Sequence, residues 1–270
     1  MTVRKYQQAG LLCIGTMLII GMCGCTPSVK EVAQENTSSK ELVVEGESTQ
    51  VEKEVVKEVF KEIKVKSKTM NEETDAYIVE IDIPVISGFE NKEFEETMNA
   101  EIDKSASDYV NLIKTMAIEI EEEGYLTSPY FAGVAYNVLR NDEKYLSLEI
   151  IYNEYTGGAH GNYFTDYINY DLAEEKSLSL GEIMKRDVDY MTVLEEAIAE
   201  AIADKRTSSE YGDALHSWYE GLEEETLSFS IQTEGLGIHF QPYEIGPYAE
   251  GAPSFVIPYE RLADVILIEK

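Results

Sequence analysis

Cysteine is nearly absent from this chain of 270 residues, and the few cysteines lie at one end. Cys13, Cys23 and Cys25 are the only three. The residues beyond 25 therefore contain no disulfide, no cysteine nucleophile and no thiolate metal ligand. An exported domain of this length can bury a sufficient core without covalent staples.

Basic residues are also scarce. The chain has 22 Lys and Arg against 52 Asp and Glu, which gives a formal net charge of −30. Removal of residues 1–24 would take away Arg4 and Lys5 but no acid, and would make the charge two units more negative. Such a surface repels nucleic acid and attracts cationic partners, and we expect no nucleic-acid binding. Simple solubility is the alternative reason for so many acids.

Histidine is limited to His160, His216 and His239, and the familiar catalytic spacings are missing. There is no H-E-x-x-H, no G-x-S-x-G and no calcium-binding loop. We therefore predict no catalytic residue, no metal site and no cofactor. A zinc site that combines His160 and His239 with Asp166 or Asp171 stays open as an alternative. A hydrogen bond from His160 to the backbone of its own loop is the simpler expectation.

The first residues have the pattern of an exported lipoprotein. Arg4 and Lys5 precede a short apolar run over residues 11–22, and the run ends in Cys23-Gly24-Cys25, which resembles a lipobox. This predicts a signal peptide over residues 1–24, lipid attachment at Cys25 and a flexible tether over residues 25–57. We thus expect anchoring on the outer face of the cytoplasmic membrane of a Gram-positive bacterium. An ordinary secretory signal or a signal anchor is the alternative.

The remaining residues predict an α+β fold with two small domains, each with helices packed on an antiparallel sheet. The first domain spans residues 58–175, and its long helix is expected over residues 90–123. Its strands are expected at 59–66, 76–86, 131–140, 145–155 and 163–172. The second domain spans residues 176–270. Its helices are expected at 189–205 and 207–222, and its strands at 226–232, 237–240 and 254–257.

Glycine and tyrosine gather around two loops. Residues 155–162 read Tyr-Thr-Gly-Gly-Ala-His-Gly-Asn, and three glycines in five positions indicate a tight, unusual turn. The chain has 18 tyrosines against eight phenylalanines and one tryptophan, and tyrosine suits surfaces that bind sugar or protein. Strand preference and core filling are the alternative. The predicted ligand-binding residues flank this loop and a second, proline-containing loop: Tyr155, Gly157, Gly158, His160, Asn162, Tyr163, Tyr243 and Tyr248.

Two stretches carry a resemblance to a known family. The first is the segment over residues 155–162, followed by Asp171 and Leu178-x-Leu180. The second runs from Phe240 to Gly251 (Phe-Gln-Pro-Tyr-Glu-Ile-Gly-Pro-Tyr-Ala-Glu-Gly) and is followed by Val256-Ile257-Pro258-Tyr259. Together they resemble the paired extracytoplasmic domains of lysozyme-responsive anti-sigma factors of the RsiV type, which also accompany the catalytic domain in PdaC-type peptidoglycan deacetylases. The resemblance covers residues 58–265.

The resemblance implies a two-domain α+β module outside the cytoplasmic membrane. In the anti-sigma members this region binds lysozyme, and in the deacetylase it lies beside a separate catalytic domain. The chain has neither a sigma-binding segment nor deacetylase ligand histidines, so neither activity is carried over. We expect a non-enzymatic surface lipoprotein that recognises a lysozyme-like protein or cell-wall glycan. Two alternatives are a wall-modifying hydrolase or deacetylase that uses His160 and nearby acids, and a structural envelope lipoprotein.

Overall fold

The computed structural model describes residues 63–206 and 212–268, all of which belong to one compact unit. The predicted signal peptide, the tether and the lipidation site Cys25 lie outside the described residues. No helix within the described ranges is long and apolar enough to cross a membrane.

The larger sheet has six strands in the order β1-β2-β3-β4-β5-β6. Neighbouring strands are antiparallel except β2 and β3, which pair in parallel. The strands are β1 (Lys64–Glu73), β2 (Tyr77–Ser87), β3 (Tyr130–Asn141), β4 (Tyr145–Tyr155), β5 (Asn162–Asp171) and β6 (Lys176–Ser177).

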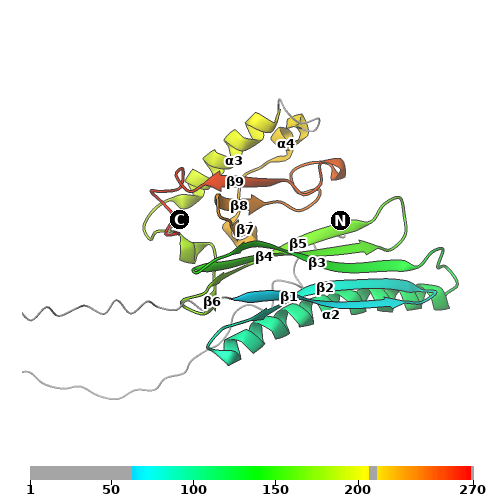
Figure 1. Ribbon diagram of the computed structural model, residues 1–270. Coiled ribbons are helices and arrows are strands. Elements are labelled where there is room, and N and C mark those ends of the chain that lie inside the picture. Colours follow the sequence, from blue (N-terminus) through cyan, green and yellow to red (C-terminus); the bar gives the residue numbers. More distant parts are fainter. Residues whose placement is uncertain (1–62, 207–211, 269–270) are drawn as a thin grey trace, which may run out of the picture. The chain divides into compact units, whose positions relative to one another are not determined.

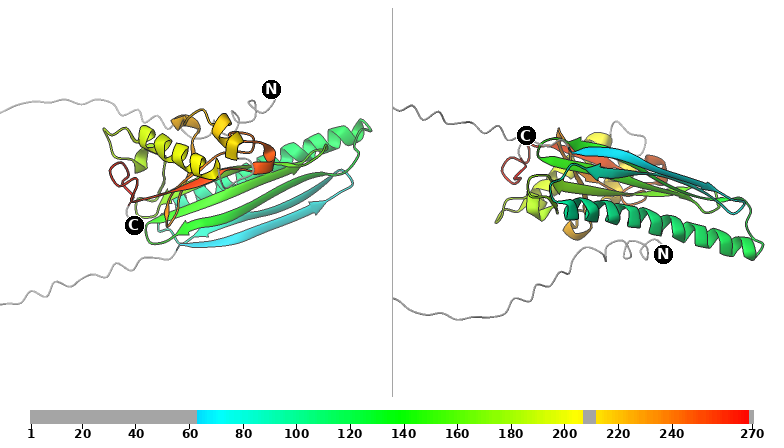
Figure 2. Two further views of the ribbon diagram at one scale, coloured as in Figure 1. Left: turned by 90° about the horizontal axis from the view of Figure 1, so that it is seen from above. Right: turned by 60° about the horizontal axis from the view of Figure 1, so that its bottom comes forward.

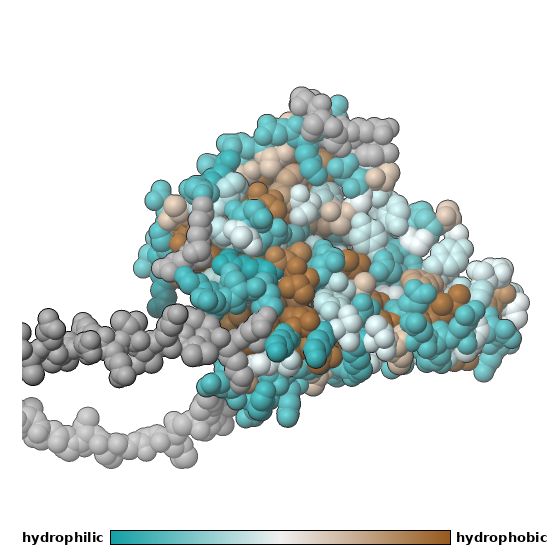
Figure 3. All heavy atoms as spheres, in the orientation of Figure 1, coloured by the Kyte–Doolittle hydropathy of each residue, from teal (hydrophilic) through white to brown (hydrophobic). Residues whose placement is uncertain are grey.

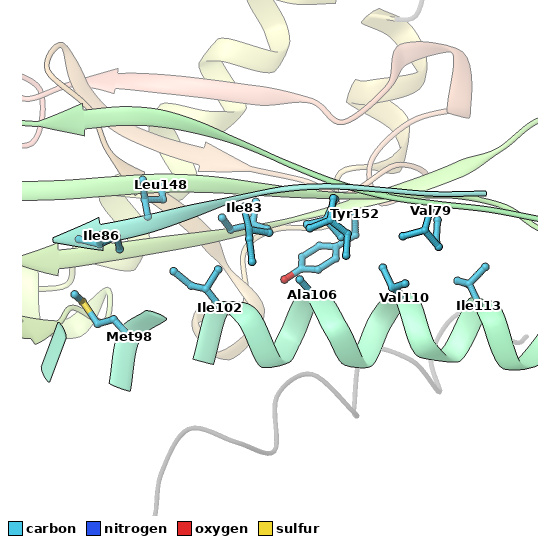
Figure 4. Close-up of a cluster of buried hydrophobic side chains, with 14 of the residues drawn as sticks. Val79, Ile83, Ile86, Met98, Ile102, Ala106, Val110, Ile113, Leu148 and Tyr152 are labelled. Atoms are coloured by element: carbon cyan, nitrogen blue, oxygen red, sulfur yellow. The ribbon is translucent and has the colours of Figure 1, made fainter. Parts of the chain in front are cut away.

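Helix α2 (Lys92–Glu122) connects β2 to β3 and covers one face of this sheet (Figures 1 and 2). Its buried positions recur every three to four residues, as expected for an amphipathic helix. Figure 4 shows these side chains pointing toward residues of the sheet such as Val79, Leu148 and Tyr152. The buried helix residues are Met98, Ile102, Ala106, Val110, Ile113 and Ala117.

A second sheet has three antiparallel strands in the order β7-β8-β9, and its two faces differ in chemistry. One face is apolar and packs with Leu194, Ile198 and Leu215 of its helices in a separate core. The other face carries Ser230, Gly237 and His239 and lies against the six-stranded sheet. The elements are β7 (Ser228–Ile231), β8 (Gly235–His239), β9 (Ser254–Pro258), α3 (Tyr190–Arg206) and α4 (Gly212–Trp218).

The described elements thus form layers: α2, the six-stranded sheet, the three-stranded sheet, and then α3 with α4 (Figure 1). In the space-filling view, hydrophilic residues cover most of the visible face, and hydrophobic residues gather mainly at the level of the six-stranded sheet (Figure 3). The predicted α+β fold is confirmed, with one core between α2 and the six-stranded sheet and a second between the three-stranded sheet and α3 with α4.

Three local predictions were wrong. The first sheet is mixed rather than antiparallel, because a helix crossover returns the chain so that β3 runs parallel to β2. The first strand extends to Glu73 rather than ending at Lys66, because its polar second half still pairs with β2 as an exposed edge. The helix predicted over residues 207–222 is described only as α4, and Gly221, with φ 115°, lies beyond its end.

Candidate functional site where two loops meet

The glycine loop, residues 156–161, joins β4 to β5. Gly157 and Gly158 have φ angles of 94° and 101°, a region that glycine enters without steric cost. A Cβ on Gly161 would lie 2.6 Å from the carbonyl oxygen of Glu154, so the two strand ends approach too closely for a side chain. The Tyr155 hydroxyl donates to the Gly158 carbonyl at 3.1 Å and folds the loop back on its strand.

The proline loop, residues 240–253, joins β8 to β9, and the side chain of Gln241 fastens its start to β5. The Gln241 Oε1 accepts from the Thr165 backbone N–H at 3.0 Å, and its Nε2 donates to the Thr165 carbonyl at 2.8 Å. The side-chain amide therefore hydrogen bonds with the backbone N–H and C=O of one β5 residue, as a neighbouring strand would. Glu244 accepts from the Gln241 backbone N–H at 2.7 Å and holds the loop start.

Aromatic rings from both loops meet in one cluster, which we call the loop stack: His160, Tyr163, Tyr243 and Tyr248. The His160 and Tyr248 rings are stacked, with centroids 4.1 Å apart and planes at 19°. Tyr243 and Tyr163 lie against Tyr248, with centroid distances of 5.4 and 6.4 Å. The Tyr248 hydroxyl also donates to the Gly161 carbonyl at 2.9 Å, so the stack joins the two loops directly.

Part of the loop stack faces solvent. Tyr243 is 51% exposed and has a φ of 68°, which is uncommon for a residue with a side chain. His160 is exposed as well. Tyr163 is more enclosed: burial raises the pKa of its hydroxyl, and a hydrogen bond with the backbone of Ala252 opposes that rise. The result is a rigid aromatic surface with an accessible rim.

The hydrogen bonds of His160 stay inside the cluster. Its Nδ1 lies 2.7 Å from the Gly161 carbonyl oxygen, which can only accept, so Nδ1 carries the proton. Its Nε2 is 3.4 Å from the Tyr243 hydroxyl. The expected bond between His160 and its own loop is therefore present. Neither ring nitrogen contacts a carboxylate or an aliphatic hydroxyl, so the described contacts supply no pair of base and nucleophile.

The other candidate histidine lies elsewhere. His239 is buried, and its two ring nitrogens are 2.7 Å from Ser230 Oγ and 2.8 Å from Ser254 Oγ. Its ring stacks on Tyr167 with centroids 3.7 Å apart, and burial lowers its pKa to about 4. Both nitrogens are thus engaged within the sheet interface. Among the described residues, no group of three or more His, Cys, Asp or Glu side chains is arranged to hold a metal ion.

The structure brings together most of the predicted ligand-binding residues and separates one. Tyr155, Gly157 and Gly158 shape the glycine loop, while the four aromatic residues form the stack. Asn162 is exposed but pairs with Glu154 on the opposite face of the β4–β5 hairpin, so it does not join them. Sequence reasoning missed Gln241, whose position before Pro242 gave no sign that its amide would pair with a strand edge.

These observations define a layered α+β module with two sheets that are fastened together by their loops. The model of the family described as "Deacetylase PdaC" matches residues 70–163, and that of "Protein of unknown function (DUF3298)" matches residues 181–260. The chain thus carries a PdaC-type region followed by a DUF3298 region of unknown function, which confirms the PdaC part of the resemblance. The boundary between the two domains, which the sequence places between residues 175 and 176, stays a prediction.

Relatives and solved structures agree with this assignment. The peptidoglycan-N-acetylmuramic acid deacetylase PdaC of Bacillus subtilis is 26% identical over 174 residues, which cover 63% of this chain and 36% of that protein. The chain therefore matches only about a third of this relative's length. DUF3298 family structures from Bacteroides fragilis and Pseudomonas aeruginosa share the fold, with TM-scores of 0.58 and 0.54 and identities of 24% and 15%. They cover 77% and 76% of this chain, and 94% of each solved chain is matched.

Proposed function

We propose that this protein is a non-enzymatic surface lipoprotein, anchored through Cys25, which recognises cell-wall glycan through the loop stack. The observation that carries the proposal is the stacked aromatic surface of His160, Tyr243 and Tyr248, in which His160 and Tyr243 are exposed. Aromatic rings with polar tips bind the apolar face of a sugar ring while hydrogen bonding at its edge. The similarity to a peptidoglycan deacetylase of Bacillus subtilis supports an extracytoplasmic, wall-associated setting.

A second candidate ligand is a basic, lysozyme-like protein. The net charge of −30 favours it, because a strongly acidic surface increases the rate at which a cationic protein associates. Binding of this kind weakens as salt screens the charges, whereas stacking on a sugar does not depend on net charge. Salt dependence therefore separates the two ligands.

The test is a titration of the purified full chain with muropeptides from digested wall, and in parallel with lysozyme at low and moderate salt. Tyr243→Ala removes the most exposed ring of the stack, and we expect it to weaken muropeptide binding about tenfold, or about 1.4 kcal/mol. Tyr125→Ala is the matched control, because Tyr125 is 73% exposed but lies after α2, outside the stack.

The results of these titrations distinguish the two proposed ligands from an enzymatic role. Muropeptide binding that Tyr243→Ala weakens and Tyr125→Ala preserves supports the proposal. Salt-sensitive lysozyme binding that Tyr243→Ala leaves unchanged supports the second candidate instead. Turnover of muropeptides by the wild type that His160→Ala abolishes would contradict a non-enzymatic role.

A further inference from the structure

A second aromatic group lies on the opposite face of the β4–β5 hairpin, and we call it the Phe164 platform: Tyr109, Tyr152 and Phe164. Phe164 stacks on Tyr152 with centroids 4.5 Å apart and planes at 9°. Tyr109 of α2 meets both rings edge-on, at 5.1 and 5.5 Å. Phe164 is nevertheless 39% exposed. One face of its ring stacks on Tyr152, and the exposed part of the ring is accessible to a ligand.

Two carboxylates flank this ring. Tyr152 is directly opposite Phe164 in the β4–β5 ladder. Glu154 follows Tyr152 by two residues on β4, and Asp166 follows Phe164 by two residues on β5, so all four share one face. Because the strands are antiparallel, Glu154 and Asp166 lie on opposite sides of the ring pair.

Neither carboxylate has a cationic partner among the described residues. Glu154 is half-buried, and its one hydrogen bond is accepted from the Tyr109 hydroxyl at 3.5 Å, near the limit for such a bond. Burial raises the pKa of Glu154, and the Tyr109 hydrogen bond only partly opposes this rise. A half-buried carboxylate of this kind gains free energy from any cation that reaches it.

We propose that the Phe164 platform binds an amino sugar whose amino group is free, as in a wall sugar that lacks its N-acetyl group. The apolar face of the sugar ring stacks on Phe164, and the ammonium group pairs with Glu154 or Asp166. An N-acetyl group removes this charge, so the acetylated sugar loses the ion pair. The proposal rests on the wall-glycan ligand class proposed above, but it uses different residues on the other face of the hairpin.

The test compares two probes that differ only in acetylation: the glucosamine hexamer and the N-acetylglucosamine hexamer. We expect the full chain to bind the glucosamine hexamer at least tenfold more tightly. The Glu154→Gln/Asp166→Asn double variant should reduce this ratio to about one. Phe164→Leu keeps an apolar side chain but removes the flat ring, and it should weaken glucosamine binding without unfolding the protein, as checked by circular dichroism.

Two controls exclude simpler causes. Glu121→Gln/Glu122→Gln removes the same charge from exposed positions at the end of α2, so a general attraction of the acidic surface for a cationic hexamer would fall equally in both double variants. The two hexamers are also compared in a Tyr243→Ala background, which weakens the loop stack, so that the remaining preference for the glucosamine hexamer reports the Phe164 platform. Muropeptide binding through Tyr243 can therefore fail or succeed independently of this site.

Equal affinity for the two hexamers would overturn the proposal. So would a preference that survives Glu154→Gln/Asp166→Asn or that falls equally in Glu121→Gln/Glu122→Gln. Oligolysine of matched charge is a third probe. If it binds more tightly than the glucosamine hexamer and depends equally on Phe164, the platform recognises a basic peptide and the amino-sugar assignment is wrong.

Discussion

Buried polar side chains of this protein gather where its two sheets meet. Asn169 of β5 is the central one: its Nδ2 donates to the Phe229 carbonyl at 2.9 Å, and its Oδ1 accepts from the Ile231 N–H at 2.9 Å and from Ser147 Oγ at 2.7 Å. Among the residues that the structure describes, the other buried polar side chains are Arg140, Ser147, Thr165, Ser230 and His239. The sheets are thus joined by specific hydrogen bonds rather than by one continuous apolar core.

Asn169→Ala should therefore destabilise the protein strongly. The change leaves two backbone groups of β7 and the Ser147 hydroxyl without a partner in a buried place, and each such group costs about 1–3 kcal/mol. We expect a loss of about 3 kcal/mol in the free energy of unfolding by urea. Ser147→Ala removes only one of these bonds and should cost about 1 kcal/mol. Equal losses in the two variants would contradict the bridging role of Asn169.

At the scale of elements, the loop that leads into α2 is held by the helix itself. Glu95 Oε2 accepts from the backbone N–H groups of Gly88 and Phe89 at 2.7 and 3.0 Å, and Lys92 Nζ pairs with its Oε1 at 2.8 Å. Asn91 caps the helix by accepting from the Phe94 N–H at 3.1 Å. These bonds fix where the crossover helix begins and so where β3 returns beside β2.

Glu95→Gln should destabilise the protein in a pH-dependent way. The hydrogen bond from Lys92, followed by those from the backbone, lowers the pKa of Glu95 below its usual value. Its stabilisation is thus present above the unfolded-state pKa and is lost as the pH falls through the lower folded-state pKa. Measured by urea, the free energy of unfolding of Glu95→Gln should be lower than that of the wild type at pH 7, and this difference should narrow at pH 3. Glu93→Gln, in the same turn but exposed, should show little deficit at either pH; a Glu95→Gln deficit that persists at pH 3 would contradict the assignment.

The elements were largely predictable because their side-chain patterns are strong. Apolar residues recur every three to four positions in α2 and alternate with polar ones in much of β2. Each pattern is local in the sequence and indicates which face of the element is buried. The parallel pairing of β2 with β3 depends on where the helix returns the chain, and the polar half of β1 has no apolar alternation to reveal it. Tyrosine and glycine marked the loop stack, but the pairing of Gln241 with Thr165 joins residues 76 positions apart and left no local pattern.

At the scale of the whole molecule, the stacking of His239 on Tyr167 connects the polar face of the three-stranded sheet to β5. Gly237 makes this arrangement possible, because a Cβ there would lie 2.4 Å from Ser230 Oγ and 2.7 Å from His239 Nε2. The interface is therefore built around a neutral imidazole whose two nitrogens are both hydrogen bonded. Protonation of that ring would place an unpaired charge between the sheets.

The stability of the whole unit should consequently fall in mild acid. Burial lowers the pKa of His239 from 6.5 to about 4, so the unfolded state takes up a proton between these values while the folded state does not. By linkage, the contribution of His239 to stability is greatest above pH 6.5 and falls as the pH drops toward 4, with a loss of about 2 kcal/mol between pH 7 and pH 5. The free energy of unfolding by urea, measured at pH 7 and at pH 5, tests this loss.

His239→Gln should be less stable at pH 7 but should lack most of this pH dependence, whereas His216→Gln, which changes an exposed ring on α4, should follow the wild type. Because the interface joins both sheets, fluorescence of Trp218 on α4 and circular dichroism of the whole chain should report one coincident transition at pH 7. Two separated transitions at pH 7, or an unchanged pH dependence in His239→Gln, would show that the sheets unfold independently of this histidine.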